Sequence, residues 1–125
     1  MRILLVDDEK EFVATLAERL NMRGIDADWV TTSQEAVERV AAESFDLAVL
    51  DVKMPKIGGM ELKKILEEKS PKLEFLFLTG YGSEAEFNAV SKELGQDHYL
   101  VKPVDIESLI AAMKAALEQS ERGEP

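Results

Sequence analysis

The sequence predicts a three-layer α/β/α sandwich around a five-stranded parallel sheet. Short apolar runs alternate along the chain with longer stretches in which apolar residues recur every three or four positions. The apolar runs are nearly continuous, which is typical of strands that helices cover on both faces. Strands that alternate with helices are joined by right-handed crossovers, so we expect the strands to be parallel.

Five apolar runs predict the strands: Ile3–Val6, a weaker Ile25–Val30, Leu47–Leu50, Phe75–Leu78 and Tyr99–Val101. Helical spacing predicts one apolar face in each of the intervals marked by Phe12, Leu16 and Leu20, by Leu62 and Leu66, by Phe87, Val90 and Leu94, and by Leu109, Ile110, Met113 and Leu117. The expected helix N-caps are Ser33, Ser83 and Asp105, and the expected C-terminal caps are Gly24 and Gly95.

Length and composition indicate one domain, which we expect to cover residues 1–120; the chain turns polar from Gln119, and residues 121–125 form a tail or the start of a linker. The chain carries 25 acidic and 15 basic residues, and a net charge of -10 argues against direct binding to nucleic acid or to an anionic membrane. The absence of cysteine excludes disulfides and thiol nucleophiles. Met1 precedes a strand rather than a signal peptide, so we expect a cytoplasmic location.

Polar residues follow four of the predicted strands. In an open parallel sheet, ligands bind beyond the carboxyl ends of the strands, so these positions are candidates for a site. They are Asp7 and Asp8, Asp51, Thr79 with Gly80, and Lys102 before Pro103. If the strand order is the flavodoxin-like 2-1-3-4-5, the strand that ends at Asp51 is central, and we expect all these side chains to converge on one crevice.

Three carboxylates in one crevice require a counter-charge. Two like charges about 5 Å apart repel by about 3 kcal/mol at an effective dielectric of about 20. Magnesium relieves such repulsion with few carboxylates and several waters. The donors for an anion would then be Lys102, the Thr79 hydroxyl and the Gly80 amide. We expect this anion to be a phosphoryl group, with Asp51 as the nucleophile that forms an aspartyl phosphate.

These residues resemble the response-regulator receiver family (CheY-like) of two-component signalling, from Ile3 to Pro103. The block Asp51–Leu62 is similar to the family's phosphorylation loop, and residues 78–80 and 99–103 to its two switch segments. The resemblance implies a signalling receiver, activated when a histidine kinase or phosphotransfer protein phosphorylates Asp51. Its only catalysis would be its own phosphorylation and dephosphorylation.

The resemblance also implies the ligands of the metal and of the phosphoryl group. Mg²⁺, for which Mn²⁺ could substitute, would be bound by Asp8, Asp51 and the backbone carbonyl of Lys53, with Asp7 acting through a water. Lys102, Thr79 and Gly80 would contact the phosphoryl group. A cis peptide between Lys102 and Pro103 would aim the lysine inward.

The same resemblance implies a switch. Thr79 would move toward the phosphoryl group and Tyr99 would rotate inward, repacking a face built from the predicted 87–94 helix, the last strand and the last helix. That face would serve an output protein or domain, or a homodimer formed on phosphorylation. Lys53 and Tyr81 depart from the family's commonest residues at positions that tune how long the phosphoryl group survives.

Several other readings compete with these. The acidic first loop, Asp7 to Glu9, would repel the phosphate of a flavin, and Lys53 stands where a haloacid-dehalogenase-type phosphatase needs a second acid. A nucleotide hydrolase would need a glycine-rich phosphate loop, which this sequence lacks. A receiver-like interaction module that works without phosphorylation stays open. So do two local alternatives, Asp8 as a plain helix N-cap and Tyr99 as plain packing.

Overall fold

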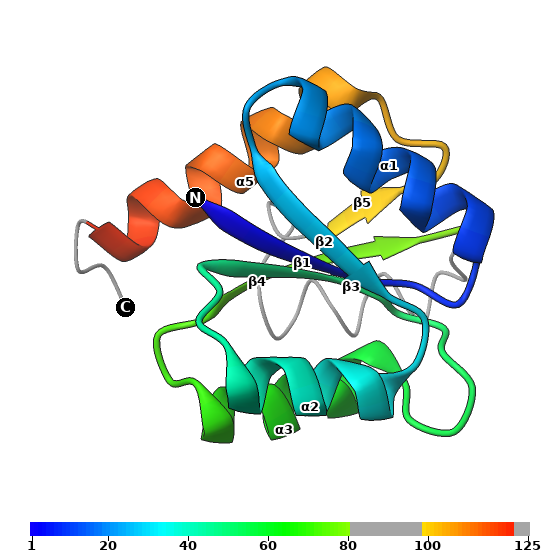
Figure 1. Ribbon diagram of the computed structural model, residues 1–125, viewed down its shortest axis with the longest axis vertical. Helices are drawn as coiled ribbons and strands as arrows, with labels where there is room; N and C mark the ends of the chain where they lie inside the picture. The colour runs from blue at the N-terminus through cyan, green and yellow to red at the C-terminus, as the bar shows by residue number, and fades with distance from the viewer. Residues whose placement is uncertain (81–98, 122–125) are drawn as a thin grey trace.

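The described residues of the computed structural model are 1–80 and 99–121, without the side chains of Thr79 and of residues 119–121. The strands are β1 (Arg2–Val6), β2 (Asp26–Val30), β3 (Leu47–Asp51), β4 (Glu74–Thr79) and β5 (Tyr99–Val101). They form one parallel sheet of order β2-β1-β3-β4-β5, which confirms the predicted order (Figure 1). The predicted helix around residues 87–94 and the expected caps Ser83 and Gly95 lie outside the described residues.

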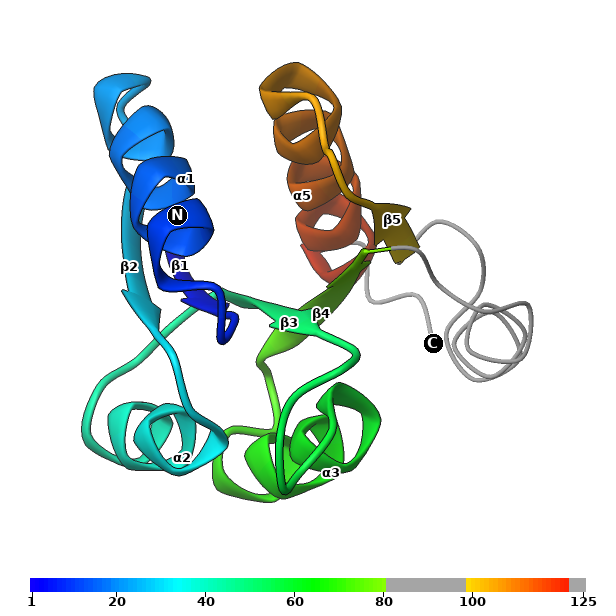
Figure 2. The same ribbon diagram turned by 90° about the vertical axis from the view of Figure 1, so that its right-hand side faces the viewer.

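Helices cover both faces of this sheet. Within the described ranges they are α1 (Lys10–Met22), α2 (Ser33–Ala42), α3 (Gly59–Lys69) and α5 (Ile106–Glu121). Helices α1 and α5 lie on one face and α2 and α3 on the other, which confirms the three-layer prediction (Figure 2). Helix α5 continues past Gln119, where the sequence turns polar. Over residues 1–80 and 99–121, every helix is too short or too polar to cross a membrane.

Strand β1 packs against the helices on both faces of the sheet. Ile3 and Leu5 pack on the side of α1 and α5, whereas Leu4 and Val6 pack on the side of α2 and α3, because successive side chains of a strand point to opposite faces. All four are at most 1% exposed. Burying each such side chain contributes about 1.5–3 kcal/mol. The ends of the central strands are therefore anchored in two cores.

The start of α2 corrects the expected cap. Ser33 is the first helical residue, and Thr32 is the N-cap. The Thr32 hydroxyl oxygen accepts from the Glu35 amide at 3.1 Å, which caps the helix, and the hydroxyl donates to the Glu35 carboxylate at 2.9 Å. The Ser33 hydroxyl instead donates to the Ile57 carbonyl at 2.9 Å and ties α2 to the loop before α3.

Two other expected caps are confirmed. Asp105 precedes α5, and its carboxylate accepts from the Ser108 amide at 3.0 Å. Gly24 follows the C-cap of α1 with a φ of 80°, the left-handed conformation that glycine adopts without steric cost.

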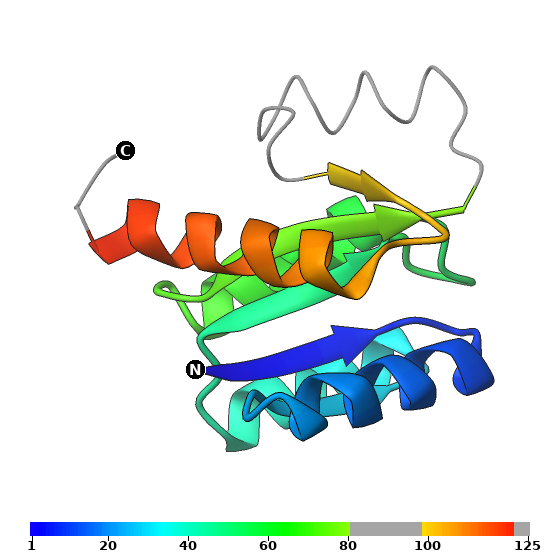
Figure 3. The same cartoon turned by 90° about the horizontal axis from the view of Figure 1, so that it is seen from above.

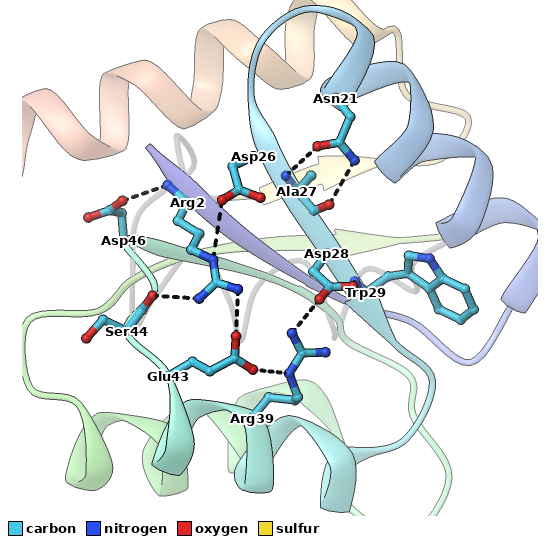
Figure 4. Close-up of polar contacts among 10 residues, drawn as sticks. All are labelled: Arg2, Asn21, Asp26, Ala27, Asp28, Trp29, Arg39, Glu43, Ser44 and Asp46. Atoms are coloured by element: carbon cyan, nitrogen blue, oxygen red, sulfur yellow. Dashed lines mark hydrogen bonds and ion pairs between the residues drawn. The ribbon is translucent and has the colours of Figure 1, made fainter.

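A network of ion pairs joins β1, β2 and α2 at the amino ends of the strands (Figure 4). Arg2 contacts Glu43 at 2.6 Å and Asp26 at 3.4 Å, and Arg39 pairs with both Glu43 and Asp28. Hydrogen bonds from Arg39 and Arg2 lower the pKa of Glu43 to about 2. The network lies at the opposite end of the strands from the carboxyl ends that carry the candidate site.

Candidate functional site

Three aspartates meet at the carboxyl ends of two neighbouring strands. Asp7 and Asp8 follow β1, Asp51 ends β3, and these strands are paired in parallel and run toward the same edge of the sheet (Figure 3). One carboxylate oxygen from each aspartate lies within 4.8 Å of the others. Asp7 and Asp51 are buried, at 3% and 5% exposure, whereas Asp8 is exposed. The structure thus brings together the three carboxylates that the sequence singled out.

The backbone of each loop holds the buried carboxylates in place. Oδ1 of Asp7 accepts from the Glu9 amide at 2.9 Å, and Oδ1 of Asp51 accepts from the Lys53 amide at 3.1 Å. Each aspartate therefore bonds the amide two residues ahead, a turn that short acidic side chains favour. The second oxygen, Oδ2, is the one that approaches Lys102 in both residues.

Helix α3 begins directly against the backbone of Asp51. A Cβ on Gly59 would lie 2.5 Å from the Asp51 carbonyl oxygen, closer than real Cβ atoms come, and the Gly59 amide donates to the Val52 carbonyl at 3.0 Å. Only glycine permits this approach. Gly59 lies in the Asp51–Leu62 block, but no role was predicted for it from the sequence. The pair of glycines at the start of a helix could have indicated this close approach.

Lys102, which directly follows β5, places a positive charge in the same crevice. Its Nζ atom lies 2.6 Å from Asp7 Oδ2, 2.7 Å from Glu9 Oε1 and 3.7 Å from Asp51 Oδ2. The peptide bond to Pro103 is cis. The side chain of Lys102 is 10% exposed, so its ammonium group is largely shielded from water.

The carboxylates outnumber the cation in this crevice, and their pKa values respond. Burial raises the pKa of Asp51 to about 6, and the charge of Asp7 adds to the shift. Burial also raises the pKa of Asp7, although the hydrogen bond from Lys102 opposes the change. Burial disfavours the charged form of Lys102, but hydrogen bonds to Asp7 and Glu9 outweigh it and raise the lysine pKa. This surplus of anionic oxygen suits a hard divalent cation.

The remaining predicted residues are only partly described. Thr79 ends β4 opposite Val101, and Gly80 follows it. The Thr79 side chain and the whole of Tyr81 lie outside the described residues, so the switch role of Thr79 and the tuning role of Tyr81 stay predictions. Tyr99 is 6% exposed and packs in the core on the side of α2 and α3, as the packing alternative expects.

The residues around Lys102 also settle one alternative and add two contacts. Asp8 is not the N-cap of α1; Glu9 is, and its side chain makes no cap hydrogen bond. Glu9 instead pairs with Lys102, and the ammonium lies 4.6 Å from the centre of the Phe12 ring. From the sequence, Glu9 was considered only as part of a loop that would repel a flavin phosphate, and Phe12 only as a residue on the apolar face of a helix. A third acid directly after two strand-end acids was the available signal.

Comparisons with known proteins agree on one family. The model of the response regulator receiver domain matches residues 3–114. The chain is 37% identical over 125 residues to the alkaline phosphatase synthesis transcriptional regulatory protein PhoP of Bacillus subtilis, covering 99% of this chain and 51% of that protein. It is 34% identical over 120 residues to the response regulator MprA of Mycobacterium avium, covering 96% of this chain and 52% of that protein.

Solved structures give the same result. A CheY-like receiver domain protein of Methanospirillum hungatei superposes with a TM-score of 0.86 at 30% identity, covering 98% of this chain and 97% of that one. A response regulator protein of Burkholderia pseudomallei, solved with a phosphorylated aspartic acid, calcium ion and citrate, gives 0.80 at 31% identity, covering 98% and 71%.

The chain spans about half the length of the curated relatives it matches. The family model covers residues 3–114, from β1 into α5. This range includes the three aspartates of the crevice and Lys102. With the predicted strand order confirmed and the strand-end aspartates in one crevice, these matches show that the chain belongs to the response regulator receiver domain family, the signalling domains of two-component systems.

Proposed function

We propose that Asp51 accepts a phosphoryl group from a phosphohistidine of a histidine kinase or a phosphotransfer protein. The observation that carries the proposal is the setting of Asp51, a buried carboxylate whose Oδ2 lies 3.7 Å from the ammonium group of Lys102. Its Oδ1 is already bound by the Lys53 amide, so the loop orients the carboxylate. A fixed carboxylate beside a shielded cation suits attack on an anionic phosphorus centre.

The transfer replaces one phosphorus bond by another. A carboxylate oxygen of Asp51 forms a bond to phosphorus while the phosphorus–nitrogen bond of the donor breaks. The bonding pair stays on the imidazole nitrogen, which takes up a proton, and the product is an aspartyl phosphate. Lys102 would pair with a phosphoryl oxygen, and the Thr79 hydroxyl and the Gly80 amide would donate to the others.

We infer that Mg²⁺ binds here, with Mn²⁺ as a substitute, to Asp8, Asp51 and the backbone carbonyl of Lys53, and to Asp7 through a water. When bound, the ion supplies positive charge that stabilises the transferring oxygens. Two observations of this chain support the fit. Carboxylate oxygens of the three aspartates lie within 4.8 Å of one another, and burial together with the charge of Asp7 raises the pKa of Asp51. The Burkholderia pseudomallei relative was solved with a phosphorylated aspartic acid and a calcium ion, which supports the proposal of an aspartyl phosphate and a divalent cation in this chain.

We further infer that phosphorylation acts through Thr79 and Tyr99 on the face that includes β5 and α5. That face would bind an output protein or domain, or a second copy of the chain, and residues 1–120 would form the receiver domain. Lys53, which is exposed beside the acceptor, and Tyr81 would control how fast water removes the phosphoryl group.

Mass spectrometry tests the proposal directly. The intact protein is incubated with acetyl phosphate, with and without Mg²⁺, alongside Asp51→Asn and the matched control Asp26→Asn, which alters an exposed aspartate on β2. We expect a magnesium-dependent gain of one phosphoryl group in wild type and control, removed by hydroxylamine as an acyl phosphate should be, and no gain in Asp51→Asn. No gain in any protein would favour an interaction module that works without phosphorylation.

A further inference from the structure

The ammonium group of Lys102 already makes two short ion pairs before any phosphoryl group arrives. In the described part of the chain its carboxylate partners are Asp7 at 2.6 Å, Glu9 at 2.7 Å and Asp51 at 3.7 Å, and the Phe12 ring lies 4.6 Å away. An ammonium group has three protons to donate. Two carboxylates already lie at hydrogen-bond distance from Lys102, so a phosphoryl oxygen on Asp51 would compete with them for the ammonium group.

Glu9 is the partner that can be displaced. Asp7 is buried and its other oxygen is bound to the Glu9 amide, so its contact with Lys102 belongs to the floor of the crevice. The Glu9 side chain, by contrast, is 62% exposed, although the Lys102 side chain that it contacts is only 10% exposed. An exposed ion pair is weak enough to open and close during the reaction.

The Glu9 carboxylate does not cap its helix. It occupies the N-cap position of α1, where side-chain oxygens usually accept from the first amides, yet it makes no such bond. Its backbone amide, which donates to Asp7 Oδ1, keeps that bond whatever the side chain is. A change confined to the carboxylate should therefore leave the loop and the helix intact.

We propose that Glu9 is a positioning residue that holds Lys102 in a resting ion pair and competes with the phosphoryl group for it. This inference rests on the proposed phosphorylation of Asp51. The Glu9 carboxylate slows phosphoryl uptake in two ways. It occupies an ammonium proton that the phosphoryl oxygen needs, and its charge at the rim of the crevice repels an anionic donor. The contact between Glu9 and Lys102 is expected to weaken as the lysine pairs with the phosphoryl group.

The experiment compares Glu9→Gln with wild type in the rate of phosphoryl uptake in Mg²⁺. Removing the charge is expected to speed uptake from acetyl phosphate, a dianion, by about two- to fivefold, the size of an exposed ion pair. Uptake from phosphoramidate, which carries less negative charge, should gain less. High salt should reduce the difference, because it screens exposed charges. A role limited to holding the fold would not depend on donor charge or salt.

A measurement without phosphorylation reports on the ion pair itself. In the protein without a phosphodonor, nitrogen-15 NMR follows how fast the Lys102 ammonium protons exchange with water. We expect faster exchange in Glu9→Gln, because one shielding partner is lost. Glu11→Gln is the matched control: it removes an equal charge two positions along, from an exposed residue in the first turn of α1 that does not pair with Lys102.

Each outcome decides the matter. Faster uptake and faster ammonium exchange in Glu9→Gln, with neither in Glu11→Gln, would support the proposal. Equal or slower uptake in Glu9→Gln, while wild type is phosphorylated, would overturn it and leave the function of Asp51 standing. Equal acceleration in both variants would also overturn it, since net charge alone would then explain the effect. No uptake in any protein would overturn the proposed function, and this inference with it.

Discussion

At the scale of single residues, the cost of burying Asp51 predicts how stability depends on pH. Its pKa of about 6 in the fold exceeds the usual value for aspartate, so between about pH 4 and 6 the folded state binds more protons than the unfolded state. The free energy of unfolding should therefore rise as the pH falls from 7 to 5. A shift of this size corresponds to about 3 kcal/mol at neutral pH.

Asp51→Asn removes that cost. We expect the variant, in EDTA at pH 7, to be more stable than wild type by up to about 3 kcal/mol, and its stability to change less between pH 7 and 5. Urea denaturation at the two pH values measures both effects. A variant no more stable than wild type at pH 7 would show that the Asp51 charge is well compensated in the metal-free protein.

Gly59 provides a second prediction at this scale. Because a Cβ there would meet the Asp51 carbonyl at 2.5 Å, Gly59→Ala must push α3 away from the acceptor strand. We expect a loss of about 1–3 kcal/mol of stability, the usual cost of overpacking, and slower phosphorylation. Gly80→Ala is the control, since no described atom lies within 4 Å of its Cβ. Equal stability of the two variants by urea denaturation would contradict the steric argument.

At the scale of elements, the Thr32 N-cap of α2 is the feature to test. Thr32→Ala removes the acceptor for the Glu35 amide and should cost about 1 kcal/mol of the free energy of unfolding. Thr31→Ala is the matched control, because Thr31 makes only a 3.4 Å contact with the Glu35 carboxylate. Thermal unfolding of the two variants should differ, with the Thr32 variant less stable; the reverse order would place the cap at another residue.

For the whole molecule, metal binding should be visible as stability. A ligand that binds only the folded state at ten times its dissociation constant stabilises it by about 1.4 kcal/mol. We therefore expect Mg²⁺ at that excess to raise the melting temperature by about 5 °C over EDTA. Asp8→Asn should abolish the rise and Asp26→Asn should keep it. Unchanged melting in Mg²⁺ for wild type would argue against a metal at the three aspartates.

Much of the molecule could be predicted because the signals are local or follow from parallel strands. Apolar runs and helical spacing depend on residues a few positions apart, so they predicted the five strands, whereas the strand order was taken from the flavodoxin-like fold. Asp7, Asp8 and Asp51 could be placed in one crevice because parallel strands end at the same edge of a sheet. The family resemblance named the roles of these residues, which the experiments above test.

Other features depend on how distant segments meet. The choice of Thr32 over Ser33 as a cap follows from the Ile57 carbonyl, which lies 24 positions away and engages the Ser33 hydroxyl. The pairing of Glu9 with Lys102 joins residues 93 positions apart. The sequence by itself therefore determined the strands, the layers and the polar residues at the strand ends, since periodicity and strand ends are local. Only the tertiary structure decided which partner each polar group takes, because that depends on where the whole chain path brings its neighbours.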